Sequence, residues 1–349
     1  MKLNQNHIFK ILTKQYIIIN KITITFTKAE ILFKYNLISD NLKLFPIILS
    51  LGLIFSFVIV SCSTNKDEDK FSKYKITSSI CTDNQGPNCK KLRLGDDYLT
   101  TLKPAKGYLF SCTEKNPNAP GAIESKINWI NFKENTWNFF EKLWLPKGTF
   151  SLGSGIYNET IDENSREIII NNIPVDQRIG DWPMTNYPEL TKIDANPGIP
   201  SSKQSSFIYP TNPTEMEIPH CVSLGPIGVT KNGVVIFNAS DARGEDALAR
   251  EIVDEFGGHP ARKKYHYHFI PERLDNEFLS NGHSGIAGYI NDGFPIYGYK
   301  GKDGIEMSND DLDLCHGHNH GKLGYHYHAT IEYPYTIGCY KGLPIIPEN

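Results

Sequence analysis

The sequence lacks the short motifs that identify the common enzyme classes. It contains no G-x-S-x-G, no H-E-x-x-H, no P-loop and no dinucleotide-binding fingerprint. It also has no basic patch and no RNA-binding signature, so nucleic acid is not an expected partner. No C-x-x-C pair is present, which argues against a site of thiolate metal ligands. Any function must therefore come from another constellation of residues.

Long segments with helical periodicity are also absent. The chain has 28 glycines and 21 prolines, and they separate short β-rich stretches at 166–174, 233–239 and 293–299. The Pro- and Asn-rich residues 183–219 are predicted to be mainly loop. One helix is predicted over 244–256, where an apolar stripe recurs at helical spacing before Gly257-Gly258.

The first 61 residues differ from the rest. The uncharged run 45–60 follows Lys43 and leads directly into Ser61-Cys62, which is the plan of a secretory signal. Residues 59–62 resemble a bacterial lipobox, in which Cys62 would be acylated and become the N-terminus; a plain membrane anchor is the alternative. We therefore expect an exported protein, anchored through Cys62 in outer-membrane lipid, with its folded part in the periplasm or outside the cell.

The cysteines fit an oxidising compartment. Besides Cys62 there are six, an even number that favours three disulfides: Cys81, Cys89, Cys112, Cys221, Cys315 and Cys339. Fifteen pairings of six cysteines are possible. Cys81 with Cys89 would close a short loop, and Cys315 with Cys339 would clamp the strand predicted at 325–328. Removal of residues 1–61 changes the net charge from −3 to −8, because seven lysines and two acids are lost.

The tetrapeptide Tyr-His-Tyr-His occurs twice, at 265–268 and at 325–328. Each copy follows an Asn-Gly or Asp-Gly turn signal (232–233 and 292–293) and an Asp-x-x-x-Gly-His pattern beginning at Asp254 or Asp313. These matches predict a duplicated unit at about 220–272 and 280–333. The expected fold is mainly β with short helices (α+β), in which two tandem repeats of about 60 residues pack with pseudo-twofold symmetry, like a β-sandwich or a barrel.

Several of these motifs together resemble the YHYH-domain proteins. The motifs are NGV (232–234), GHP (258–260), the two YHYH segments, DGFPIYG (292–298), DLDLCHGH (311–318), GYHYHAT (324–330) and YPYTIGCYKG (333–342). The resemblance covers about 166–345 and implies a secreted or lipid-anchored protein without implying a reaction. Phe256 departs from the pattern, because members often have cysteine there. The expected organisation is an extension and signal (1–61), a tether (62–75), a β-rich region (76–165) and the YHYH domain (166–345).

The histidines are the candidate functional residues, since ten of eleven lie between His220 and His328. In a strand, His-x-His places both imidazoles on one face, about 7 Å apart, where they can converge on one ion. The Gly-His residues supply a third ligand in each copy. The predicted metal sets are His259, His266 and His268 in the first copy and His318, His326 and His328 in the second.

Other residues have supporting or open assignments. Asp254 and Asp313 are expected as second-shell partners that orient the ligating rings. The two sets could also merge into one dinuclear site. His316 and His320 occur only in the second copy and are expected to be exposed, with extra ligation as the alternative. The aromatic residues around Trp129, Trp137 and Trp144 are expected to form a core rather than a sugar-stacking surface.

Imidazole ligands suit copper or zinc, and outside the cytoplasm copper competes well. The favoured function is a lipid-anchored protein that binds one of these metals. One alternative is a metal-dependent hydrolase or oxidase acting on an extracellular substrate. The other is a structural or adhesion module whose histidines are architectural.

Overall fold

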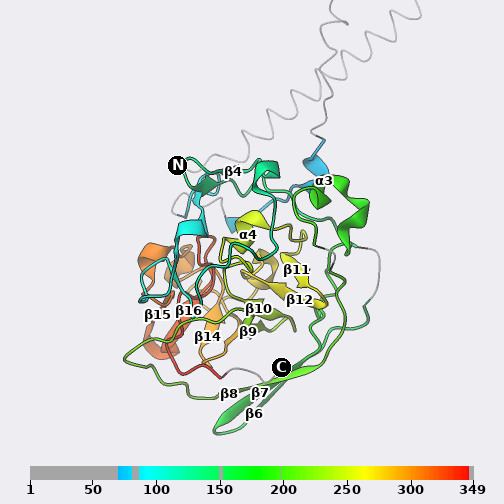
Figure 1. The fold of residues 1–349 in the computed structure, drawn as a ribbon. Coiled ribbons are helices and arrows are strands. Elements are labelled where there is room, and N and C mark those ends of the chain that lie inside the picture. Colours follow the sequence, from blue (N-terminus) through cyan, green and yellow to red (C-terminus); the bar gives the residue numbers. More distant parts are fainter. Residues whose placement is uncertain (1–69, 81–85, 149–151, 197, 346–349) are drawn as a thin grey trace, which may run out of the picture. The chain divides into compact units, whose positions relative to one another are not determined.

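A mixed eight-stranded sheet forms the centre of the protein (Figure 1). The computed structural model describes residues 70–80, 86–148, 152–196 and 198–345; Cys62 and Cys81 lie outside these ranges. The strands are β9 (Pro226–Thr230), β10 (Val235–Phe237), β11 (Gly258–Ala261), β12 (Lys264–Tyr267), β13 (Ile286–Ile290), β14 (Pro295–Tyr297), β15 (Gly317–Asn319) and β16 (Tyr325–His328). Across the sheet their order is β11-β12-β10-β9-β13-β14-β16-β15. The sheet is open, with β11 and β15 at its edges.

Two hairpins occupy the middle of this sheet. β9 pairs with β10 and β13 with β14, each antiparallel, and the hairpins meet where β9 pairs with β13. Gly233 and Gly293 adopt positive φ angles of 78° and 89° in the two turns, which explains the Asn-Gly and Asp-Gly signals. Where the central strands meet, a Cβ on Gly228 or Gly288 would lie 2.4 or 2.3 Å from the carbonyl oxygen of Tyr289 or Val229. Glycine is therefore required for this close pairing.

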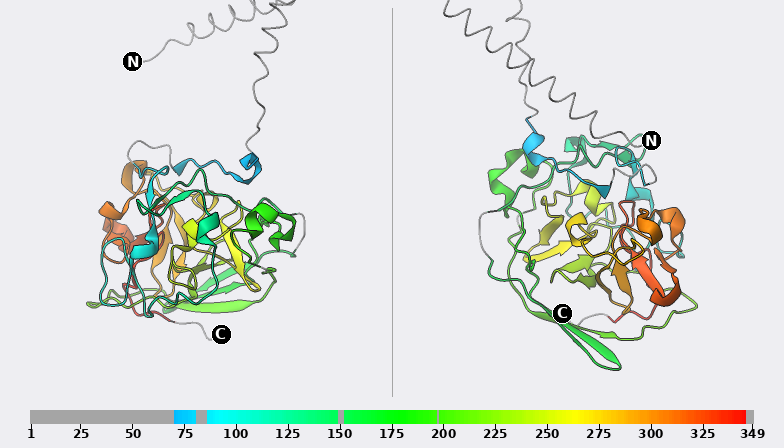
Figure 2. Two further views of the ribbon diagram at one scale, coloured as in Figure 1. Left: turned by 45° about the horizontal axis from the view of Figure 1, so that its top comes forward. Right: turned by 180° about the vertical axis from the view of Figure 1, so that it is seen from behind.

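The YHYH strands lie outside the hairpins. β12 runs parallel to β10, and β16 runs parallel to β14. The edge strands β11 and β15 then pair antiparallel with β12 and β16. Figures 1 and 2 show β11 and β12 on one side of the molecule and β15 and β16 on the other.

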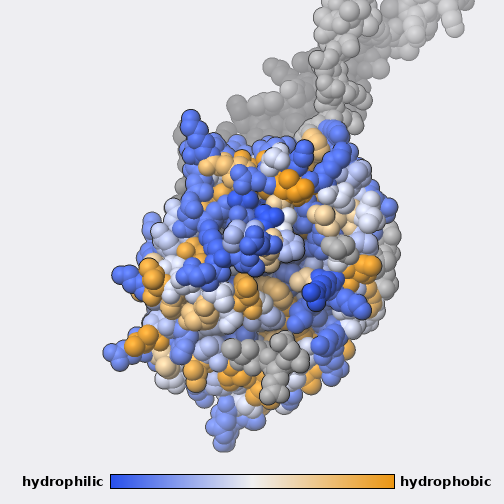
Figure 3. Space-filling model, viewed as in Figure 1, coloured by the Kyte–Doolittle hydropathy of each residue, from blue (hydrophilic) through white to orange (hydrophobic). Residues whose placement is uncertain are grey.

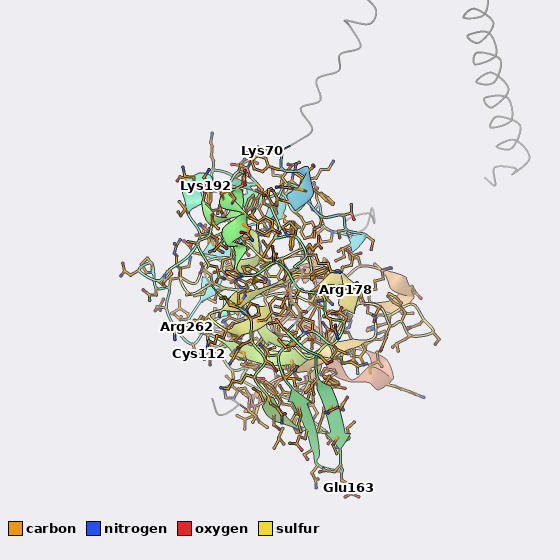
Figure 4. The ribbon with its side chains drawn as sticks, turned by 90° about the vertical axis from the view of Figure 1, so that its right-hand side faces the viewer. Lys70, Cys112, Glu163, Arg178, Lys192 and Arg262 are labelled. Atoms are coloured by element: carbon orange, nitrogen blue, oxygen red, sulfur yellow. A yellow bond between two sulfur atoms is a disulfide. The ribbon has the colours of Figure 1, made fainter. Side chains whose placement is uncertain are left out.

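A second, three-stranded antiparallel sheet projects from the body. It contains β6 (Tyr157–Ile161), β7 (Ser165–Ile170) and β8 (Ser205–Pro210), and Glu163 lies at the tip of the β6–β7 hairpin (Figure 4). β8 falls within 183–219, so the expectation of a loop-dominated segment is wrong there. Its alternating pattern buries Phe207 and Tyr209, while Ser206 and Ile208 face outward. Within the same segment lie a 3₁₀ turn, Met184–Asn186, and α3 (Pro188–Thr191).

The region before β6 consists mostly of irregular chain with short strands. These are β1 (Leu92–Arg93), β2 (Leu99–Thr100), β3 (Leu109–Phe110), β4 (Ile130–Asn131) and β5 (Thr136–Trp137). Trp129, Trp137 and Trp144 are buried, as expected of a core. They belong to the same core as the tyrosines of β12 and β16, rather than to a core of their own. Trp129 Nε1 donates a hydrogen bond to the carbonyl of Ala249, at 2.7 Å.

The helix predicted over 244–256 is only one turn long. α4 covers Ala247–Arg250, and the chain becomes extended at Glu251 (φ −80°, ψ 154°). The backbone beyond that point pairs with another segment, because the N–H of Leu145 donates to the carbonyl of Val253. Tertiary pairing therefore overrides the apolar periodicity. Short 3₁₀ turns occur elsewhere, at Ser72–Tyr74, Gly95–Asp97, Glu124–Lys126, Glu272–Leu274, Lys302–Gly304, Asn309–Asp311 and Gly321–Leu323.

Disulfides link distant parts of the fold. Cys112 bonds to Cys221, and Cys315 bonds to Cys339, the second being one of the pairs predicted. Cys89 is also disulfide-bonded, whereas Cys81 lies outside the described residues. These bonds fit an oxidising compartment.

The expectation of a mainly β protein with short helices is confirmed. In the described part of the chain, no helix has the length and apolar character needed to cross a bilayer. On the face drawn in Figure 3, polar side chains surround small apolar patches.

A buried ion pair joins the N-terminal region to the end of α4. Arg250 Nε donates to both carboxylate oxygens of Asp96, at 3.0 and 2.9 Å, and its Nη2 donates to one of them as well. The two side chains are 5% and 13% exposed. The pair therefore fixes α4, and with it Glu251, relative to the preceding region.

We predict that Arg250→Ala lowers the free energy of unfolding by about 3–5 kcal/mol, because it leaves the Asp96 carboxylate buried without its partner. Urea denaturation measures the change. Lys91→Ala is the control, since it breaks the exposed Lys91–Glu134 pair and is expected to cost less than about 1 kcal/mol. Equal losses in the two variants would contradict a structural role for the buried pair.

Candidate metal centres

The Tyr-His-Tyr-His strands separate their side chains onto two faces. His266 and His268, and likewise His326 and His328, point to one face, while the tyrosines between them point to the other. All eight side chains are buried, with exposures between 0 and 5%. The period of two predicted from the sequence is thus realised in both strands.

The tyrosine face belongs to the core and contacts three carboxylates, of which Asp254 and Asp292 are buried and Asp313 is half-buried. Tyr265 donates to Asp254 at 2.7 Å, and Tyr325 donates to Asp313 at 3.1 Å. Tyr327 donates to Asp292 at 2.5 Å. Burial raises the pKa of Asp254 and of Asp292. Asp254 and Asp313 therefore accept hydrogen bonds from tyrosines of these strands, and the Nδ1 atoms of most of the histidines face backbone carbonyls instead.

Site one consists of His259, His266 and His268. His259 on β11 lies directly opposite His266 on β12. The Nε2 atom of His268 is 3.0 Å from that of His266 and 3.1 Å from that of His259. The ring of Phe237 stacks on His266, with centroids 3.9 Å apart. The structure thus brings together all three residues of the first predicted set.

Site two consists of His318, His326 and His328, joined by His283. His318 lies opposite His326 across β15 and β16, and their Nε2 atoms are 3.1 Å apart. His283, just before β13, places its Nε2 3.2 Å from that of His328. Within each site, the candidate ligand atoms all lie within 4.8 Å of one another.

Backbone carbonyls fix the orientation of most of these rings. His266 Nδ1 faces the carbonyl of Lys264 at 3.2 Å, and His268 Nδ1 faces that of Asn238 at 2.5 Å. In site two, the Nδ1 atoms of His283, His326 and His328 face carbonyls of Ser284 (2.7 Å), Gly324 (2.9 Å) and Gly298 (2.8 Å). A carbonyl oxygen only accepts, so each Nδ1 must carry the proton and each Nε2 must present a lone pair.

These orientations place two acceptor nitrogens against each other in each site, and two neutral rings arranged in this way cannot form a hydrogen bond. His266 and His268 face each other through two Nε2 lone pairs, and so do His283 and His328. Burial, and next the neighbouring His268, lowers the pKa of His266 well below its usual value, and burial lowers that of His268 to about 4. Burial likewise lowers the pKa of His283 and His328. An added proton is therefore an unfavourable way to separate the lone pairs.

A bound cation would resolve the conflict. Imidazole nitrogens bind zinc at about 2.0–2.1 Å, so two ligands at a tetrahedral ion lie roughly 3.3 Å apart. The observed separations of 3.0–3.2 Å are close to this value. Ligating histidines typically donate their other ring N–H to a carbonyl or carboxylate, and the carbonyls opposite Nδ1 here would accept such a bond. The residues present therefore fit a transition-metal ion.

Site one also has a carboxylate beside its rings. Glu251 Oε2 lies 3.5 Å from His259 Nε2 and 3.8 Å from His268 Nε2. Burial, followed by repulsion from Asp194, raises the pKa of Glu251 well above its usual value. Behind it, Lys142 Nζ donates to the backbone carbonyl of Glu251 at 2.6 Å, and burial lowers the pKa of that lysine to about 7. The site opens onto a cavity of about 480 Å³ that is lined in part by Glu251 and the three histidines.

The sequence did not predict two residues of these sites, His283 and Glu251. The position equivalent to His283 in the first copy, sixty residues earlier, is occupied by Ser223. The comparison of the two copies therefore did not indicate a ligand at His283. Glu251 was placed inside a predicted helix, where nothing indicated that it points toward the histidines. An isolated histidine next to a glycine turn was the only signal for His283.

The remaining histidines have other surroundings. His316 is buried, and its Nε2 lies 3.0 Å from Thr330 Oγ1, so the expectation of exposure is wrong for it. His320 is half-buried beside site two, with its ring centroid 5.4 Å from that of His283. His220 forms an isolated bridge with Tyr340 and belongs to neither group of histidines.

The fold and the sites define a mainly β protein with two clusters of mostly buried histidines at one sheet. Residues 206–308 match the family model described as "YHYH protein". The chain therefore contains a YHYH domain, and the resemblance given by its motifs is confirmed. The matched segment includes site one and His283 but ends before the other members of site two. Among curated proteins and solved structures, nothing matches the chain.

We predict that His266, His268, His283 and His328 are protonated at Nδ1 and not at Nε2, because their Nδ1 atoms face carbonyl oxygens. Two-dimensional ¹⁵N correlation spectra of the imidazole rings measure the tautomer directly. His316 is the comparison, because its hydrogen-bonded nitrogen is Nε2. An Nε2-protonated tautomer at both members of a facing pair would contradict the proposed orientation of the lone pairs.

Proposed function

We propose that this protein binds a transition metal, copper or zinc, at two separate histidine sites. The observation that carries the proposal is the pair of contacts His266–His268 and His283–His328, at 3.0 and 3.2 Å. In each, two Nε2 acceptors face each other while the Nδ1 atoms are engaged with carbonyls. Only a shared cation or proton makes such a contact favourable, and a metal ion would accept the Nε2 lone pairs of both rings.

The donor sets support these metals. Site two offers four imidazoles, a set that suits copper and zinc, and copper has the higher affinity in the usual order of divalent ions. Site one offers three imidazoles with a carboxylate nearby. We therefore expect copper to compete well at both sites, with zinc as the alternative.

We further propose that the two sites belong to a duplicated unit with pseudo-twofold symmetry, within a YHYH domain at 166–345. The supporting observation is that the sheet order reads the same from either edge, with β9 and β13 at its centre. Five strand spacings separate β12 from β16, which at about 4.8 Å each gives roughly 24 Å. This distance favours two mononuclear sites over one dinuclear site.

The cellular location is also a proposal. The signal at 45–60 and Cys62 lie outside the described residues, so the structure leaves the lipid anchor untested. The disulfides support an oxidising compartment. We propose an exported protein whose Cys62 is acylated and held in outer-membrane lipid. The tether expected at 62–75 ends before Tyr74, because that residue is buried in the main core.

A metal-dependent hydrolase or oxidase is the second candidate function. The cavity beside site one favours it, because an ion held there by three histidines would keep a position open toward that cavity. An architectural role for the histidines, as in a structural or adhesion module, would leave the facing Nε2 pairs unexplained.

We predict that untagged protein contains two equivalents of copper or zinc, measured by elemental analysis. His266→Ala and His328→Ala should each remove one equivalent, and the double variant both, because each change breaks one site. His220→Ala is the control and should retain both equivalents, since His220 lies outside both sites.

The outcomes separate the candidate functions. In one outcome, the purified protein contains no stoichiometric metal and neither substitution changes its affinity for added copper or zinc. That result would exclude both metal-dependent functions and favour the architectural role. Loss of both equivalents from one single substitution would instead favour a shared dinuclear site. Stoichiometric metal with turnover of a test substrate would favour the enzyme.

We predict that Cys62→Ser abolishes lipid attachment and releases the protein from the membrane fraction, because the acylated thiol is removed. Mass spectrometry of the wild-type N-terminus should show a chain beginning at an acylated Cys62. A mature chain beginning upstream of Cys62 would contradict the proposal. Lys133→Gln is a suitable control, because it changes an exposed residue of the folded part without touching the signal.

A further inference from the structure

A second cavity lies next to the cavity of site one. Its volume is about 830 Å³, within the range typical of small-molecule sites. The two cavities share part of their walls, namely Leu224, Gly225, Ala261 and Arg262. A molecule in the larger cavity would therefore lie next to the smaller cavity, which the histidines of site one line.

The larger cavity has a strongly positive lining. Four cationic side chains line it, and no acidic side chain does: Lys203, Arg262, Lys263 and Lys264. Within the described part of the chain, none of the four forms an ion pair, and Lys203 lies close enough to Lys264 for their charges to repel. Lys203, Arg262 and Lys263 are exposed and Lys264 is half-buried, so their unpaired positive charges are available to attract an anion to the cavity.

Two of the cationic residues lie in a turn whose backbone is held by hydrogen bonds. Arg262 and Lys263 form the turn between β11 and β12, and Arg262 lies at the surface (Figure 4). Their carbonyls accept hydrogen bonds from the N–H groups of Ile199 and Ser201, at 2.9 and 3.0 Å. The turn is therefore tied to the segment that leads to Lys203, so the positive groups are held around one space.

The rest of the lining suits an organic molecule. Hydroxyl groups are supplied by Ser201, Ser205, Ser206 and Ser223, and the apolar residues Ile170, Phe207 and Val235 also contribute. Hydroxyl and ammonium groups bind carboxylate or phosphate oxygens, while the apolar residues contact carbon atoms. A bare inorganic ion would leave most of the space and its apolar wall unused.

We propose that this cavity binds a small organic anion that carries carboxylate or phosphate groups and lies against site one. The inference that an anion binds depends only on the lining of the cavity. Its contact with a metal ion at site one rests, in addition, on the proposed function.

The experiment uses two anionic probes, succinate and glycerol 3-phosphate, with glycerol as the neutral comparison. Calorimetric titration of chelator-treated protein should show saturable binding of at least one anion and none of glycerol. Lys203→Gln/Lys264→Gln should weaken that binding at least tenfold. Lys133→Gln/Lys322→Gln is the matched control, because it removes two exposed lysines that do not line the cavity. The two probes distinguish a carboxylate from a phosphate ligand.

A second titration tests the position of the anion. Adding the bound probe to copper-loaded protein should change the visible and electron paramagnetic resonance spectra in wild type and in His328→Ala, which keeps site one. No saturable binding of either anion, or equal weakening in the cavity and control variants, would overturn the proposal. Binding without a spectral change would overturn the contact with site one. Protein that binds no metal yet binds the anion would refute the proposed function alone.

Discussion

The two candidate sites depend on one contact made twice, between a histidine ring and a carbonyl of the neighbouring hairpin. His268 Nδ1 faces the carbonyl of Asn238, and His328 Nδ1 faces that of Gly298. Both carbonyls follow the second strand of a hairpin, and the parallel pairing of β12 with β10 and of β16 with β14 brings them there. Because this contact fixes the tautomer, it also aims the Nε2 lone pair into the site. The pairing of the sheet thereby determines the chemistry of the histidines.

The tyrosines on the opposite face of β12 and β16 help to fix the register of these strands. The tyrosines that alternate with the histidines are buried in the main core, and all but Tyr267 donate to Asp254, Asp292 or Asp313. The hydroxyl of Tyr267 instead accepts hydrogen bonds from Asn232 and Arg273. A shift by one residue along β12 or β16 would place imidazoles in the core and phenol groups in the site. The hydroxyl–carboxylate contacts oppose such a shift, since buried carboxylates without donors would be costly. The acids thus support the sites through strand register.

Much of the fold and of the sites could be predicted from local pattern, and the failures share a physical cause. Alternation in the YHYH strands and the Gly-His signals grouped His259, His266 and His268 and the equivalent residues of the second copy, because these depend on period and on neighbouring strands. His283 and Glu251 could not be predicted, since each reaches its site through contacts distant in sequence. The short α4 and the extended Glu251 have the same origin: pairing with Leu145 decides the backbone, and no local propensity encodes that partner.

The two sites differ in the group that accompanies their three matched histidines. If both sites bind metal, this difference predicts different roles for them. His283 adds a fourth imidazole to site two, and four nitrogen ligands leave a tetrahedral ion no open position. At the corresponding place in the first copy stands Ser223, which lines the cationic cavity instead. Site one therefore has three imidazoles, a carboxylate just beyond bonding distance and two adjoining cavities. An incoming ligand could reach an ion in site one without displacing a histidine, whereas in site two it would have to replace one. Exchange or reaction is thus expected at site one and retention at site two.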